Sequence, residues 1–173
     1  MRNRRRIVIG GSVYHVCNRG SRKGELFEGC EDYDAFERLM EDARQKTGMR
    51  VLAYHLMRNH FHFLLWPRES DDLQNYMQWL TSTHAKRWHR HRNSAGTGAV
   101  YQSRYTAIAV RDERQLLTVW RYVERNALAA GLVNRAEDWR WSSAPRPSGP
   151  PSGFTVDPCP FKLPDNWLDF LNE

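Results

Sequence analysis

The chain has 173 residues, of which 40% are hydrophobic and 12% aromatic, so it can form one domain with its own core. Its formal net charge of +6 favours a polyanionic partner, and nucleic acid is the first choice. No stretch approaches the roughly 20 apolar residues of a membrane span, and the apolar run after the arginine-rich start is too short for a signal peptide. We therefore expect a cytoplasmic protein without a membrane partner.

The predicted elements alternate between strands and helices. Periodicity and turn residues give a strand at 12–18, a helix at 30–48, strands at 49–57 and 60–66, a helix at 70–92, a strand at 99–110 and a helix at 112–131. Gly48 is expected to stop the first helix, Ser70 to cap the second and Gly131 to end the third. This order predicts an α+β fold: a ferredoxin-like β-α-β-β-α-β antiparallel sheet with helices on one face, plus a third helix.

Composition divides the chain at residue 144. We expect residues 1–144 to form one domain, because they contain all the predicted elements. Residues 145–173 are rich in proline, serine and glycine at first, which is typical of an extended tail, and end in a short segment with one or two helical turns from Asp165.

The stretch RNHFHFLLWP (58–67) places two histidines inside an apolar strand. Residues i and i+2 of a strand face the same side, so His60 and His62 project together while Phe61 and Phe63 face the opposite, buried side. The two histidines are then about 7 Å apart at the backbone, close enough for two imidazoles to bind one divalent metal. The alternative is a pair of solvated histidines on an open sheet face.

A tyrosine and an asparagine on the third helix could complete such a site. Tyr122 and Asn126 are four residues apart, so on a helix they point to the same spot beside the apolar stripe. Asn126 offers an amide oxygen to a hard cation and Tyr122 offers a phenol. The spacing alone leaves open that they are an ordinary boundary tyrosine and a polar helix residue.

Five stretches occur in a characteristic order: YHVCNRG, AYHLMRNHFHFLLWP, VYQSRYTAIAVRDE, RYVERNALAAGLV and DWRWSS. Together they resemble the single-tyrosine HUH transposases, most closely the REP-associated tyrosine transposases of bacteria, over roughly residues 5–144. The resemblance implies an HUH nuclease fold. It also implies metal-dependent cutting and rejoining of single-stranded hairpin DNA, with Mg²⁺ or Mn²⁺ as the cofactor, by a monomer or a homodimer.

The resemblance also assigns site residues. It implies that His60, His62 and Asn126 bind the metal and that Tyr122 is the nucleophile, which forms a 5′-phosphotyrosine. Ala127 stands where relatives usually have proline. Since alanine is a better helix former, we expect the third helix to continue regularly to Gly131.

Single-stranded DNA needs phosphate contacts, and basic residues gather around the predicted site. The candidates are Arg19, Arg22, Lys23, Arg58, Lys86, Arg87, Arg90, Arg92, Arg104, Arg121 and Arg125. For each of them the alternative is a solvated basic face.

Three other functions compete with transposition. A hairpin-binding module that has lost cleavage is disfavoured because His60, His62, Tyr122 and Asn126 are all present. A replication-initiator or relaxase nickase is disfavoured by the short chain and the lack of a second tyrosine motif. A zinc hydrolase unrelated to DNA would have no use for the basic charge.

Overall fold

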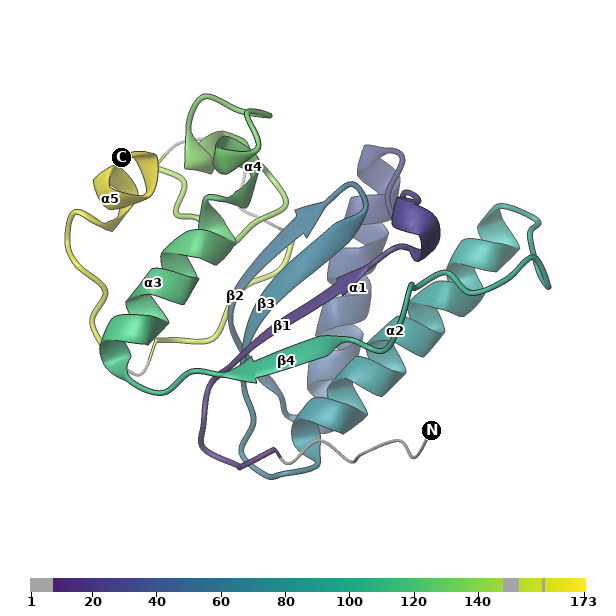
Figure 1. Cartoon of the computed structure of the whole chain (residues 1–173), viewed down its shortest axis with the longest axis horizontal. Coiled ribbons are helices and arrows are strands. Elements are labelled where there is room, and N and C mark those ends of the chain that lie inside the picture. The colour runs from purple at the N-terminus through teal and green to yellow at the C-terminus, as the bar shows by residue number, and fades with distance from the viewer. Residues whose placement is uncertain (1–7, 148–152, 160) are drawn as a thin grey trace.

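A four-stranded antiparallel sheet in the order β2-β3-β1-β4 organises the chain (Figure 1). The computed structural model describes residues 8–147, 153–159 and 161–173. The strands are β1 Tyr14–Arg19, β2 Arg50–Met57, β3 His60–Trp66 and β4 Thr106–Ala109. The helices are α1 Cys30–Thr47, α2 Asp72–His91, α3 Glu113–Glu124, α4 Asn126–Ala129 and α5 Trp167–Asn172, with short 3₁₀ turns η1 Ser21–Lys23 and η2 Ala136–Asp138. The predicted ferredoxin-like α+β fold is confirmed.

Helices cover both faces of the sheet (Figure 1). On one face α1 and α2 pack over Phe61 and Phe63, which are fully buried as the strand pattern predicts. On the other face α3 packs over Leu64 of β3. The third helix therefore lies opposite the first two, and β3 is buried on both sides over most of its length.

A bulge in β2 sets which residues face α3. The pairing with β3 shifts between Val51 and Ala53, so that Leu52 and Ala53 both pack on the α3 side. A bulge adds one residue to one strand and reverses the facing of everything after it. As a result Tyr54 packs with the α1 side, and His55 faces α3 directly opposite His62.

One of the two helix ends predicted from Gly48 and Ser70 agrees with the structure and the other differs. Gly48 ends α1 in the left-handed conformation at φ 68°, as predicted. Ser70 does not cap α2: the Asp72 carboxylate accepts hydrogen bonds from the backbone N–H groups of Arg68 and Glu69 at 2.9 Å, and the helix begins at Asp72. The N-cap position falls on Asp71, one residue later than predicted, so the Ser70 hydroxyl is not placed to cap the helix.

The predicted strand at 99–110 was too long, and so was the helix at 112–131. Only Thr106–Ala109 pair with β1, and before them a single bridge joins Tyr101 to Gly20. The helix breaks at Arg125 (φ −94°, ψ 11°), so Tyr122 and Asn126 stand on separate helices, α3 and α4. The expectation of a regular helix to Gly131 was wrong.

The end of the chain packs against the domain. Phe154, Trp167 and Leu171 are buried, the last two in the cluster under α3. The arginine-rich start, residues 1–7, and part of the proline-rich segment, residues 148–152, lie outside the described residues. In the described part of the chain no helix is long and apolar enough to cross a membrane.

Candidate active site

His60 and His62 lie side by side on the sheet face that α3 covers. Their ring centroids are 5.1 Å apart and the ring planes are perpendicular. His62 is only 7% exposed and His60 is half-buried. The alternative of two solvated histidines on an open sheet is therefore wrong for this pair.

Each of the two rings is held through its Nδ1 atom. His62 Nδ1 lies 3.0 Å from Nε2 of His15, a residue of β1, and His60 Nδ1 lies 2.7 Å from the amide oxygen of Asn59. A hydrogen bond at one ring nitrogen fixes which nitrogen carries the proton and which keeps a lone pair. When His60 and His62 donate through Nδ1, both keep the Nε2 lone pair as a ligand.

The same burial keeps both imidazoles neutral. Burial lowers the pKa of His62 to about 2, helped by the neighbouring rings of His15 and His60. Burial and then the Arg19 charge lower the pKa of His60, while the nearby Asn126 side chain acts in the opposite direction. Neutral imidazole is the form that binds a metal.

Tyr122 stands directly against the histidines. Its ring meets the His62 ring edge to face at 5.4 Å between centroids and the His15 ring at 5.8 Å. Trp120 and Val123 of the same helix are buried against the sheet, which turns Tyr122 outward and leaves it 51% exposed. The phenol and both histidines come from one chain, so no exchange between subunits is needed to bring them together.

Asn126 reaches the site through the break in the helix. It begins α4, and its side chain lies close enough to the His60 ring to act on the pKa of that imidazole. The structure therefore brings together all four predicted site residues, although the i,i+4 helix geometry expected for Tyr122 and Asn126 is interrupted at Arg125.

Sequence reasoning missed three residues around this cluster. His15 and Asn59 orient the two histidines, and His55 lies opposite His62 in β2. His55 is fully buried beside the parallel ring of Trp139, and burial lowers its pKa to about 3. The sequence did hold a signal for His15. In YHVCN, His15 and Cys17 are two residues apart and so share one face of β1, and this is the face that carries the site.

Most of the predicted DNA-contacting residues are exposed: Arg19, Arg22, Lys23, Arg58, Lys86, Arg87, Arg90 and Arg104. Arg58 is exposed but pairs with Glu25 at 2.8 Å. The remaining three candidates are less exposed. Arg92 pairs with Glu28 and Asp32 at 3.0 and 2.8 Å. Arg121 donates to the Phe170 carbonyl at 2.7 Å, and Arg125 is half-buried at the helix break.

The donors around Tyr122 form an imidazole and amide set. Among residues 8–147, 153–159 and 161–173, no three His, Cys, Asp or Glu side chains are grouped so that they could hold a metal ion. The set of His60, His62 and Asn126 is not such a group, because its third member is an asparagine. Two oriented, neutral imidazoles with one amide oxygen suit Mn²⁺ at least as well as Mg²⁺.

A ferredoxin-like sheet, an HxH pair in one of its strands and a tyrosine on a helix across that face define an HUH-type α+β domain. The family model of the IS200-like transposases matches residues 10–126, which is more than half of the chain. The protein belongs to the IS200-like transposase family, and the resemblance found in the sequence is confirmed at the level of the family.

A solved structure of a transposase shares this fold. The structure of a REP-associated tyrosine transposase bound to a REP hairpin matches with a TM-score of 0.68 and 18% sequence identity, covering 83% of this chain and 82% of that one. A candidate transposase from Deinococcus radiodurans matches with a TM-score of 0.47 and 17% identity, covering 72% of this chain and 96% of that one. No curated protein matches this sequence.

Proposed function

We propose that this transposase is a metal-dependent endonuclease and strand transferase that acts on single-stranded hairpin DNA, with Tyr122 as the nucleophile. One observation carries the proposal: a half-exposed phenol contacts the buried ring of His62, which lies beside the half-buried ring of His60, and the Nδ1 atoms of both histidines are already engaged. Covalent catalysis needs an accessible nucleophile beside the group that binds the reacting phosphate. Tyr122 is the tyrosine that meets this requirement.

His60, His62 and Asn126 would hold the cation. A bound Mg²⁺ or Mn²⁺ would supply Lewis-acid assistance by drawing charge from the scissile phosphate. His15 and Asn59 would keep the two imidazoles in the ligating orientation, since groups that bind ligating histidines from behind fix the ring and its tautomer. His55, the partner of His62 on the neighbouring strand β2, is fully buried beside it.

The chemistry of the tyrosine balances without a further reactant. The phenol oxygen bonds to phosphorus and loses its proton, the bond from phosphorus to the 3′-oxygen breaks, and that oxygen takes up a proton as a 3′-hydroxyl. A different 3′-hydroxyl can then attack the 5′-phosphotyrosine, which releases Tyr122 and joins the two strands. Because a phosphodiester is exchanged for a phosphodiester, ATP is not required.

Several features support hairpin DNA as the substrate. The net charge is +6, and exposed basic residues flank the site, among them Arg19, whose backbone pairs with His60. The similar structure of a REP-associated transposase holds a REP hairpin. All four site residues come from one chain, which supports cleavage by a monomer, and a homodimer would bring two such sites together for the full reaction.

A covalent adduct tests the proposal. A labelled single-stranded hairpin from the gene's own genomic surroundings, incubated with Mn²⁺, should give a protein–DNA band that survives denaturing electrophoresis and is lost with EDTA. Tyr122→Phe should abolish the band and leave hairpin binding nearly unchanged, because only the hydroxyl is removed. Tyr105→Phe is the matched control and should retain the band.

The outcomes separate the competing functions. Loss of the adduct in Tyr105→Phe instead would show that the nucleophile is misassigned. Binding without any adduct in the wild type would favour the hairpin-binding module that has lost cleavage. Cleavage without rejoining would favour a nickase of the initiator or relaxase type.

A further inference from the structure

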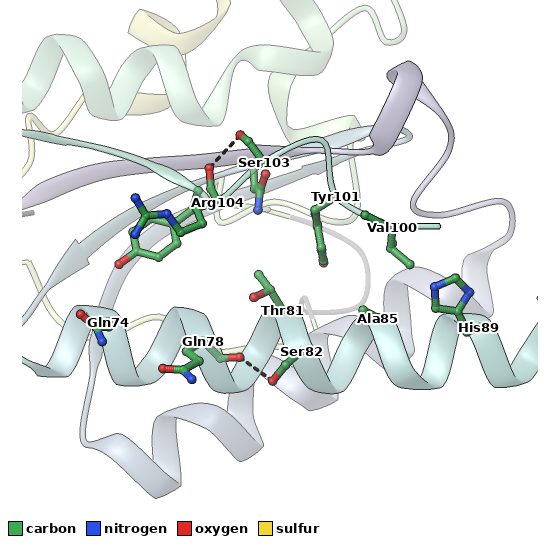
Figure 2. A pocket seen from close by; sticks show the side chains of 13 residues that line it. Gln74, Gln78, Thr81, Ser82, Ala85, His89, Val100, Tyr101, Ser103 and Arg104 are labelled. Carbon is green, nitrogen blue, oxygen red and sulfur yellow. Dashed lines mark hydrogen bonds between the residues drawn. The ribbon is translucent and has the colours of Figure 1, made fainter. Parts of the chain in front are cut away.

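A cavity of about 700 Å³ lies between α2 and the segment 99–105, on the sheet face opposite the histidines (Figure 2). Gln74, Gln78 and Thr81 line it from the helix, and Tyr101 and Arg104 line it from the segment. Its volume is within the range of about 300–1,000 Å³ that is typical of small-ligand sites. The proposed chemistry does not use this cavity.

The cavity exists because β4 is short. Pairing between β4 and β1 ends at Thr106 with Cys17, and the residues before Thr106 leave the sheet edge and run over α2. Two backbone hydrogen bonds anchor the start of this segment to the end of β1 and the residues that follow it: Gln102 N–H to the Arg19 carbonyl at 2.9 Å, and Ser21 N–H to the Val100 carbonyl at 2.8 Å. The other end of the segment is held by the pairing of β4 with β1.

The lining combines apolar walls with amide groups. The Tyr101 hydroxyl is tied to His84 Nδ1 at 2.6 Å, which holds its ring in the wall. Asn18, only 7% exposed, also lines the cavity. Its amide oxygen accepts from the Arg19 N–H at 2.8 Å, and within the described ranges its NH₂ group makes no hydrogen bond. That NH₂ group belongs to a residue that lines the cavity, so it is a donor available to a ligand there.

Two further side-chain amides and one guanidinium group line the opening of the cavity. Gln74 and Gln78 are exposed and lie one turn apart on α2, and Arg104 is exposed on the facing segment (Figure 2). Aromatic and apolar walls suit the flat face of a nucleobase, amides pair with its polar edge, and a guanidinium suits the phosphate attached to it. An apolar peptide would leave the amide groups unpaired.

The cavity and the catalytic site are neighbours through β1. Asn18 faces the cavity, and the next residue, Arg19, is the backbone partner of His60. Successive residues of a strand point to opposite faces, so the two sites occupy opposite faces of the same end of the sheet. Pairing along this edge of β1 is interrupted between Thr106, which pairs with Cys17, and Tyr101, which bridges to Gly20. A DNA strand that contacts both sites would therefore run around the outer side of residues 103–105.

We propose that the cavity receives an unpaired nucleobase of the same single-stranded DNA that is cleaved at Tyr122. This proposal rests on the proposed function and adds a second contact point for its substrate. The extruded base would stack against the tyrosine wall and pair with the amides of Asn18 and Gln78, while Arg104 contacts its phosphate.

Filling the cavity tests the inference. Ser82 lines it from an exposed position of α2, so Ser82→Trp should occupy the base site without disturbing the core. Asn75→Trp, on the same helix but outside this cavity, is the matched control. Binding of fluorescein-labelled oligothymidylate and oligodeoxyadenylate of about twelve nucleotides should weaken roughly tenfold in Ser82→Trp and stay unchanged in Asn75→Trp.

Photocrosslinking gives an independent readout. Oligothymidylate carrying 5-iododeoxyuridine should crosslink to the peptide containing Tyr101 and Tyr105 in the wild type and in Asn75→Trp, and not in Ser82→Trp. Equal affinities of the two variants, or crosslinks only elsewhere, would overturn the inference while the Tyr122 adduct leaves the proposed function standing. A wild type that neither binds these probes nor forms the adduct would overturn both.

Discussion

Glu124 is the buried group on which the position of the tyrosine helix should depend most. It is 3% exposed and accepts three hydrogen bonds, from Trp120 Nε1 at 3.0 Å, from Trp167 Nε1 at 2.8 Å and from the Ser143 hydroxyl at 2.7 Å. These bonds join α3 to α5 and to the segment after η2. Tyr122 and Asn126 lie two residues to either side of it.

The cost of removing this carboxylate follows from those three bonds. Glu124→Ala leaves two indole N–H groups without an acceptor and leaves the Ser143 hydroxyl only the more distant Tyr54 carbonyl at 3.3 Å. Each of the three lost bonds costs about 1–1.5 kcal/mol. The total, about 3–5 kcal/mol, is a large part of the 5–15 kcal/mol by which a typical domain is stable. Glu124→Gln keeps the volume but presents one NH₂ in place of an oxygen, so at least one donor faces another donor and the loss should be intermediate.

Urea denaturation followed by circular dichroism measures these losses. The order of stability should be wild type, then Glu124→Gln, then Glu124→Ala. Glu113→Ala removes an exposed carboxylate from the first turn of the same helix and should cause a much smaller change. A loss below about 1 kcal/mol in Glu124→Ala would refute the claim that this network fixes α3.

Two further predictions concern histidines on opposite faces of the sheet. His15→Ala removes the partner of His62 Nδ1 and should weaken Mn²⁺ binding about 10- to 100-fold in calorimetric titration, whereas unchanged affinity would exclude an orienting role. Burial lowers the pKa of His84 in the folded protein to about 4, from its usual 6.5. As the pH falls, the unfolded chain therefore binds a proton at this residue before the folded chain does. The stability that is present at pH 7 is then lost between about pH 6.5 and pH 4. Urea denaturation measures the free energy of unfolding at pH 7 and at pH 5. Between these two pH values His84→Asn should lose about 2 kcal/mol less stability than the wild type. Equal losses in the two proteins would contradict the claim that His84 causes this pH dependence.

Local patterns in the sequence were enough for part of the site. The two-residue period of a strand puts His60 and His62 on one face and Phe61 and Phe63 on the other, whatever the rest of the fold does. Gly48 ends its helix because the left-handed conformation there costs glycine little. The motif order also identified the family, although the roles of the site residues remain predictions.

The orientation of the histidines could not be read in the same way. His15 meets His62 because β1 and β3 pair in one particular register, and His55 lies opposite His62 because one extra residue at Leu52 reverses the facing of β2. Both facts depend on pairing between segments that are distant in the chain, and hydrophobic alternation within one segment does not specify such pairing.

The sequence by itself determined the order of the elements, the chemistry available at each position and the pair of histidines that share a face. Only the tertiary structure decided that α3 ends at Arg125 and that Tyr122 and Asn126 reach the histidines from two separate helices. It also decided that β4 begins only at Thr106, which leaves a cavity between residues 99–105 and α2. The physical reason is that helix breaks and strand ends are set by what packs against them, and here the packing partners come from remote parts of the chain.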